Sequence, residues 1–88
     1  MNEELKLLFK ISDSLKEQKL IKSVRFFSST YLGKSQNYLN VLKYLNKKPS
    51  ISSCSYLQYK LNVQNIFPEF QMELFRLIKN KLASQELR

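Results

Sequence analysis

The side chains best suited to chemistry in this chain are amides and cations grouped between residues 33 and 50. This stretch reads GKSQNYLNVLKYLNKKPS and contains no acid. Gln36, Asn37 and Asn40 carry amides that can pair with the edge of adenine, and a lysine can reach guanine or a phosphate. The stretch therefore predicts a surface for an anionic partner, although the same pattern also fits the solvent face of an ordinary amphipathic helix.

The positive charge of the chain is concentrated in its middle. Fifteen Lys and Arg residues stand against seven Asp and Glu residues, which gives a net charge of +8. No acid occurs between Gln18 and Pro68. That window holds Lys19, Lys22, Arg25, Lys34, Lys43, Lys47, Lys48 and Lys60. A block of one sign in a small folded chain favours an anionic partner, with nucleic acid ahead of an acidic protein or a membrane surface.

Several common kinds of active site are missing from the sequence. There is no His, which removes the commonest general base and the commonest zinc ligand. The single Cys54 has no base among its neighbours, and one glycine is too few for a Gly-rich phosphate loop. We therefore expect a protein that is not an enzyme and that has no cofactor and no metal site.

The composition predicts an all-α fold. A chain of 88 residues suffices for one domain, and one Gly with two Pro is too few for the turns of a β-rich fold. We expect one domain, residues 1–88, built as a compact five-helix bundle. No apolar run reaches the roughly 18–20 residues of a membrane span, and the N-terminus does not look like a signal peptide. With a single cysteine, these features predict a cytoplasmic protein without a membrane partner.

Capping residues and apolar spacing predict where the five helices lie. The first is expected over 2–18 with Asn2 as its cap, and the second over 24–32 with Ser23 as its cap and Gly33 at its end. The third is expected over about 36–45 with Ser35 as its cap. Ser50 is expected to cap a fourth helix, which ends before an NVQN loop at 62–65. The last is expected over about 67–85, with Pro68 in its first turn.

This order of helices resembles the lambda-repressor-like helix-turn-helix domains of the Cro/C1 type. The resemblance covers about residues 20–63, with the motif itself at about 23–45. It is carried by Leu32-Gly33-Lys34-Ser35 at the turn, by the ungapped stretch from Ser35 to Pro49-Ser50, and by SISSCSYLQYKL in the fourth helix. The chain departs from the family where Phe27-Ser28 or Ser28-Ser29 replaces the usual Leu-Ala, and where Lys43 and Leu45 replace an acid and a glycine.

The resemblance implies a sequence-specific regulator that binds double-stranded DNA. The expected base-reading residues are Gln36, Asn37, Asn40 and Tyr44. The expected phosphate-binding residues are Arg25, Lys34, Ser35, Lys43, Lys47 and Lys48. A chain this small would act as a homodimeric repressor of phage, plasmid or bacterial type.

The last helix has more apolar positions than its own packing requires. We expect it to form a dimer interface with Phe70, Leu74, Phe75, Ile78 and Leu82. Two alternatives remain open at this point. The chain is a phage- or plasmid-encoded inhibitor or antitoxin that binds a protein partner through this helix, or it binds RNA. The second alternative ranks last because the aromatic residues fall mostly at spacings typical of a core.

Overall fold

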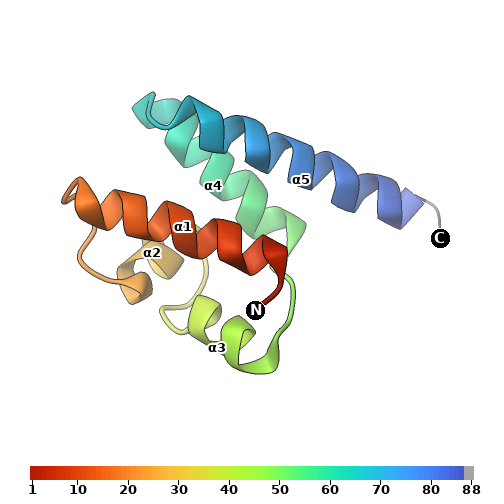
Figure 1. The fold of residues 1–88 in the computed structure, drawn as a ribbon, viewed down its shortest axis with the longest axis horizontal. Coiled ribbons are helices and arrows are strands. Elements are labelled where there is room, and N and C mark those ends of the chain that lie inside the picture. The colour runs from red at the N-terminus through yellow and green to blue at the C-terminus, as the bar shows by residue number, and fades with distance from the viewer. Residues whose placement is uncertain (87–88) are drawn as a thin grey trace. The chain divides into compact units, whose positions relative to one another are not determined.

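The structure, a computed structural model, describes residues 1–86 and contains five α-helices and no strand within that range (Figure 1). The helices are α1 (Glu3–Glu17), α2 (Val24–Thr30), α3 (Tyr38–Leu45), α4 (Ile51–Gln64) and α5 (Pro68–Glu86). The predicted all-α class with five helices is confirmed. The chain divides into two compact units, which we call unit 1 (Met1–Pro49) and unit 2 (from Ser50 onward).

Unit 1 is built on α1, which begins where the sequence predicts. The side-chain oxygen of Asn2 accepts a hydrogen bond from the Leu5 backbone N–H at 2.9 Å, so Asn2 caps the helix as expected. One face of α1 supplies four fully buried side chains, namely Leu5, Leu8, Ile11 and Leu15. This face packs against α2 and α3.

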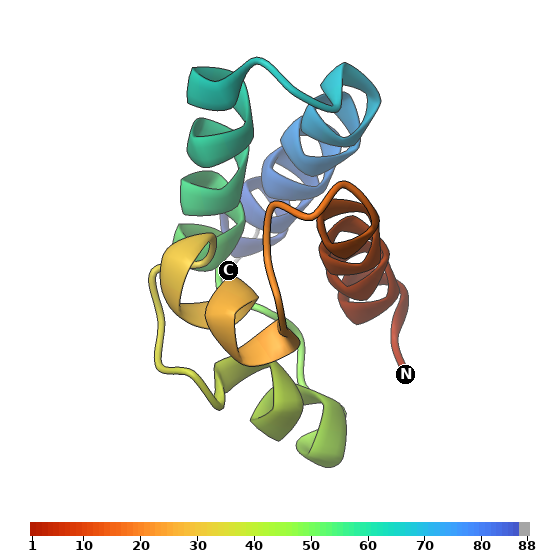
Figure 2. The same ribbon diagram turned by 90° about the vertical axis from the view of Figure 1, so that its left-hand side faces the viewer.

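The two short helices α2 and α3 complete the core of unit 1 (Figure 2). Ser23 caps α2 as predicted, since its hydroxyl accepts from the Phe26 backbone N–H at 3.1 Å. The Phe27 ring is fully buried and stacks on the Tyr31 ring with a centroid distance of 5.9 Å. Leu39 and Leu42 fix the inward face of α3 because both are buried.

The start of α3 differs from the prediction. The helix begins at Tyr38 rather than near residue 36, and its cap position is Asn37, whose side chain makes no capping bond. Ser35 does not cap; its backbone carbonyl instead accepts from the Tyr38 N–H at 3.1 Å. The Leu39 N–H is satisfied from another helix, by the hydroxyl of the buried Ser28 at 3.4 Å. Sequence-local capping rules could not reveal a cap supplied by α2.

The connection between α2 and α3 depends on Gly33. This residue has φ of 66°, in the left-handed region that glycine enters at little cost. The turn also folds back on α2, since the Lys34 N–H donates to the Ser28 carbonyl at 3.0 Å. Ser28 therefore holds both the turn, through its carbonyl, and α3, through its hydroxyl.

In unit 2, α4 begins as predicted and ends later. The Ser50 hydroxyl accepts from the Ser53 N–H at 3.1 Å and caps the helix. The predicted NVQN loop is wrong, because residues 62–64 belong to α4. Asn65 ends the helix with φ of 56°, doing what a glycine usually does, and the Ile66 N–H then donates back to the Leu61 carbonyl at 3.1 Å.

α5 returns antiparallel to α4 (Figure 1). Pro68 occupies its first position, as predicted. The Gln71 side chain links α5 to the last turn of α4 and to the connection that follows it. Its N–H₂ group donates to the Leu61 carbonyl at 3.4 Å and to the Ile66 carbonyl at 2.9 Å. Leu74 has no exposed surface. This residue therefore belongs to the core and cannot itself contact a second copy, contrary to its predicted place in a dimer interface.

Candidate nucleic-acid interface

All ten residues predicted to contact DNA lie in unit 1, between Arg25 and Lys48. One lies on α2, three lie in the connection and one at the cap position of α3, three lie on α3, and two follow it. Nine of the ten are exposed, and Lys34 is half-buried. The structure thus places this set on one unit, within one continuous segment.

The outward face of α3 is a mixture of amide, cationic and apolar side chains. Asn40 and Tyr44 lie one helical turn apart, on the side opposite to the buried Leu39 and Leu42. Tyr44 is 87% exposed, so its ring contributes almost nothing to the core. Asn40 makes no side-chain hydrogen bond within the described residues. Val41 and Leu45 continue this face as an exposed apolar flank, although Leu45 was expected to continue the buried face of Leu39 and Leu42.

Two of the predicted residues contact each other directly. A guanidinium N–H of Arg25, on α2, donates to Oε1 of Gln36 in the connection at 3.1 Å. This hydrogen bond leaves the Gln36 amide N–H₂ group free to donate and takes up one of the two lone pairs of its carbonyl oxygen. If Gln36 pairs with both edge groups of an adenine, its oxygen is then shared with Arg25 or released by it.

The predicted lysines lie in three different surroundings. Lys34 Nζ is 5.8 Å from the centre of the Tyr38 ring, and Lys43 Nζ is 5.5 Å from the centre of the Phe9 ring on α1. Lys48 Nζ lies 3.8 Å from a carboxylate oxygen of Glu4. Lys47 makes its hydrogen bond through the backbone, since its carbonyl accepts from the Asn2 side chain at 3.3 Å. The charges of Lys43 and Lys47 thus face no acid in the ion pairs found within residues 1–86.

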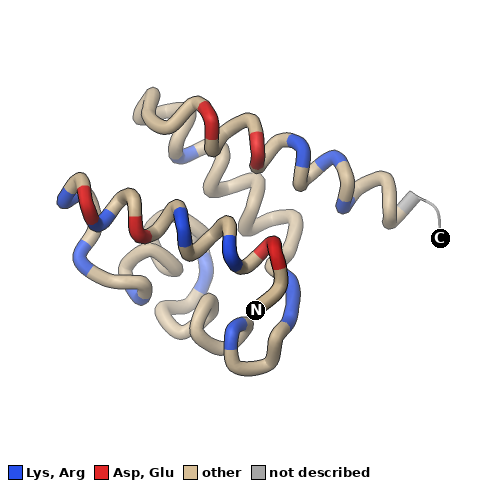
Figure 3. Tube along the Cα trace, viewed as in Figure 1, with Lys and Arg blue, Asp and Glu red and all other residues tan. Residues whose placement is uncertain are grey.

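The acids of unit 1 are confined to α1. Glu3 pairs with Lys6 at 3.3 Å and Asp13 with Lys16 at 3.8 Å, both along the helix. In Figure 3 the trace through α2, α3 and their connection carries cations and no acid. Ten of the fifteen cations and four of the seven acids belong to unit 1, which therefore holds six of the eight excess positive charges.

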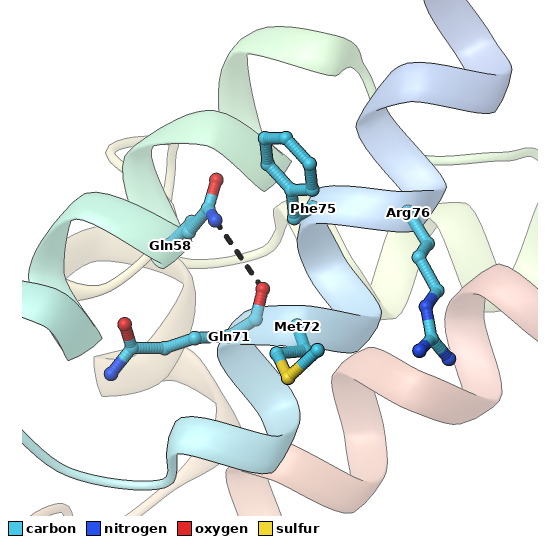
Figure 4. A pocket seen from close by; sticks show the side chains of 5 residues that line it. All are labelled: Gln58, Gln71, Met72, Phe75 and Arg76. Carbon is cyan, nitrogen blue, oxygen red and sulfur yellow. Dashed lines mark hydrogen bonds between the residues drawn. The ribbon is translucent and has the colours of Figure 1, made fainter.

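Sequence reasoning missed a hollow in unit 2. It has a volume of about 180 Å³ and lies between α4 and α5 (Figure 4). Its lining residues are Gln58, Gln71, Met72, Phe75 and Arg76. The spacing of Met72 and Phe75, three residues apart on α5, was the available signal, since it continues the apolar surface of that helix onto a second face.

Two further features are not found among residues 1–86, a metal-binding group and a membrane-spanning helix. No group of three or more carboxylate or thiol side chains in that range could hold a metal ion. None of the helices in the same range combines the length and the apolar content that a membrane span needs.

Comparisons with known proteins bear on the family alone. Neither a search of curated proteins nor a search of solved structures returned a match. The sequence does match a family model over residues 8–73, which is more than half of the chain. The chain therefore belongs to DUF6626, a family of unknown function.

Proposed function

We propose that this chain is a sequence-specific regulator that binds double-stranded DNA through unit 1. The observation that carries the proposal is the outward face of α3, where Asn40 and the 87% exposed Tyr44 lie one turn apart within a segment that has no acid. A short helix with unpaired polar and aromatic groups on a basic surface has the chemistry needed to enter a major groove.

The surrounding cations suit contacts to phosphate. Arg25, Lys34 and Lys47 come from α2, from the connection and from the segment after α3, so they precede and follow α3 along the chain. Phosphate contacts of this kind supply affinity and orientation, whereas base contacts supply specificity. We assign the base-reading role to Asn37, Asn40 and Tyr44, with Gln36 as a donor that Arg25 holds in place.

Repression through a homodimer is part of the proposal, with a smaller apolar surface than the sequence predicts. Leu74 is buried, Phe70 and Ile78 are half-buried, and Phe75 and Leu82 are exposed. Sedimentation of the free protein at micromolar concentration tests for the dimer. A monomer at that concentration, without DNA, would refute the dimer and favour a different protein as the partner of α5.

The experiment that tests the proposed function is a selection from random DNA duplexes, followed by binding measurements on the enriched sequence. Asn40→Ala and Tyr44→Ala should each lower affinity for that sequence by about 1–3 kcal/mol and leave binding to random duplex nearly unchanged. Asn62→Ala, which removes an exposed amide from α4 in unit 2, is the matched control. Failure to enrich any duplex would refute the proposal.

Single-stranded nucleic acid is a second candidate ligand, and exposed tyrosines favour it. Tyr44 was expected on the outward face of its helix, whereas the exposure of Tyr56 and Tyr59 goes against the expectation that the aromatic residues lie mostly at core spacings. An exposed ring can stack on an unpaired base. A single-stranded RNA or DNA competitor that displaces the selected duplex at equal concentration would favour this candidate over the first.

A further inference from the structure

Unit 2 presents a surface that the proposed DNA interface does not use. The hollow between α4 and α5, which we call the α4–α5 pocket, has Met72 and Phe75 on its wall, 60% and 53% exposed. Its volume of about 180 Å³ is below the roughly 300–1,000 Å³ of sites for small molecules. The pocket is therefore better suited to one or two side chains of a protein than to a cofactor.

The polar groups at the base of the pocket are already engaged in binding α4 to α5. The Gln58 side chain donates to the Gln71 carbonyl at 3.3 Å, the bond drawn in Figure 4. The Gln71 side chain in turn donates to the Ile66 carbonyl at 2.9 Å. These bonds fix the spacing of the two helices, so the pocket is formed before any ligand arrives. A preformed site saves a ligand the cost of ordering it.

The one charged side chain in the lining of the pocket is a cation, and the acids Glu69 and Glu73 of α5 lie outside that lining. Arg76 lines the pocket, is exposed, and makes no hydrogen bond or ion pair within the described residues. Lys79 lies one turn further along α5, with its Nζ 5.6 Å from the centre of the Phe75 ring. No acid lines the pocket. A ligand that matches this surface needs an apolar side chain next to a carboxylate.

We propose that the α4–α5 pocket docks an acidic amphipathic helix of a partner protein. A large apolar side chain of that helix enters between Met72 and Phe75, and an Asp or Glu on the neighbouring turn meets Arg76 and Lys79. A helix in a groove between two helices is a recurring mode of peptide recognition, and opposite charges at its rim select the partner.

A second copy of this chain fits the pocket less well. A two-fold contact centred here would place the same patch against itself. Arg76 and Lys79 would then approach their own equivalents, and like charges brought together across an interface oppose binding. This charge pattern favours a partner that is itself acidic at the contact.

The test uses three fluorescent peptides that share one amphipathic helical sequence with leucines on one face. Their other face carries Glu, Gln or Lys. We expect the Glu peptide to bind the full chain most tightly, by anisotropy titration at physiological salt. In ¹H–¹⁵N spectra its binding should shift the signals of the pocket residues and leave those of α3 unchanged.

Two variants and one control decide the assignment. Arg76→Glu should weaken the Glu peptide by about tenfold and strengthen the Lys peptide, because it removes one attraction and adds one repulsion of similar size. Phe75→Ala should weaken all three peptides. Lys22→Glu, which makes the same charge change on unit 1, should have little effect. Circular dichroism confirms that each variant is folded.

Three outcomes would overturn the proposal. The first is equal binding of the three peptides. The second is an equal loss in Lys22→Glu, which would mean attraction to the net charge alone. The third is a dimer at micromolar concentration that Arg76→Glu or Phe75→Ala dissociates, which would assign this face to a second copy. The first two outcomes leave the proposed DNA binding untouched, and the third would support the homodimer of the proposed function while it removes the partner helix, so failure of one proposal is distinguishable from failure of the other.

Discussion

Units 1 and 2 hold their helices in place in different ways. Unit 1 has two very short helices, α2 with seven residues and α3 with eight, whereas α4 has 14 and α5 has 19. Helices shorter than about 12–15 residues are marginal on their own in water. The short helices of unit 1 must therefore be held by bonds from outside themselves, and the long pair in unit 2 depends less on them.

The hydrogen bonds agree with this contrast. In unit 1 Ser28 binds both the connection and α3, and Asn2 binds the Lys47 carbonyl just after α3. In unit 2 the main polar link is Gln71, which closes the turn between two helices that pack along their length. The side chains of Ser28 and Asn2 thus fix α3 and the segment after it, and they leave the outward face of that helix unpaired.

The two units also differ in charge, because unit 1 holds most of the excess positive charge. The largest predicted effect tests whether this difference matters for DNA binding. Changing Lys43 and Lys47 together to Ala should weaken DNA binding roughly 10–100-fold at low salt and reduce the slope of log affinity against log salt by about two. The matched change in unit 2 is Lys79 and Lys81 to Ala. Measured by anisotropy at several salt concentrations, equal losses in the two variants would show that the units do not differ in their contact with DNA.

The next largest effect concerns the bonds that hold α3. Ser28→Ala should lower the free energy of unfolding by about 1–2 kcal/mol, because the buried Leu39 N–H loses its acceptor. Ser55→Ala, at an exposed position of α4, is the control and should be neutral or slightly stabilising. Urea denaturation measures both. If Ser28→Ala is as harmless as its control, α3 is held by packing alone.

Local signals in the sequence predicted the helix starts that depend on local chemistry. Asn2, Ser23, Ser50 and Pro68 each act within one turn of their own helix, and each was placed correctly. The start of α3 was misplaced because its cap comes from Ser28 on another helix. The end of α4 was misplaced because an asparagine, rather than a glycine, adopts the left-handed conformation there.

The candidate sites show the same limit. The exposure of Asn40 followed from helical spacing, since Leu39 and Leu42 define the buried face beside it. The burial of Leu74 and the exposure of Phe75 did not follow from helical spacing, because both residues lie on a broad apolar face. Only the position of the neighbouring helix decides which of the two side chains is buried. The spacing of Met72 and Phe75 indicates a second apolar face of α5, but the α4–α5 pocket itself forms only where the two helices pair.

The smallest predicted effect separates stability from binding at the edge of the basic surface. Glu4 lies in the first turn of α1, its side chain is 15% exposed, and it pairs with Lys48 at 3.8 Å. Glu4→Gln removes that attraction and a favourable charge at the helix N-terminus, so the free energy of unfolding should fall by up to about 1 kcal/mol. The same change frees Lys48 for a phosphate, so DNA affinity should rise about two- to threefold at low salt. The gain should vanish at high salt, where exposed charges are screened.

Glu69→Gln is the counterpart in unit 2, since Glu69 lies in the first turn of α5. It should cost similar stability through the helix terminus and leave DNA affinity unchanged. If Glu4→Gln lowers stability but raises DNA affinity, and Glu69→Gln does not raise DNA affinity, the DNA surface is confined to unit 1. A gain in both variants would mean that only net charge matters.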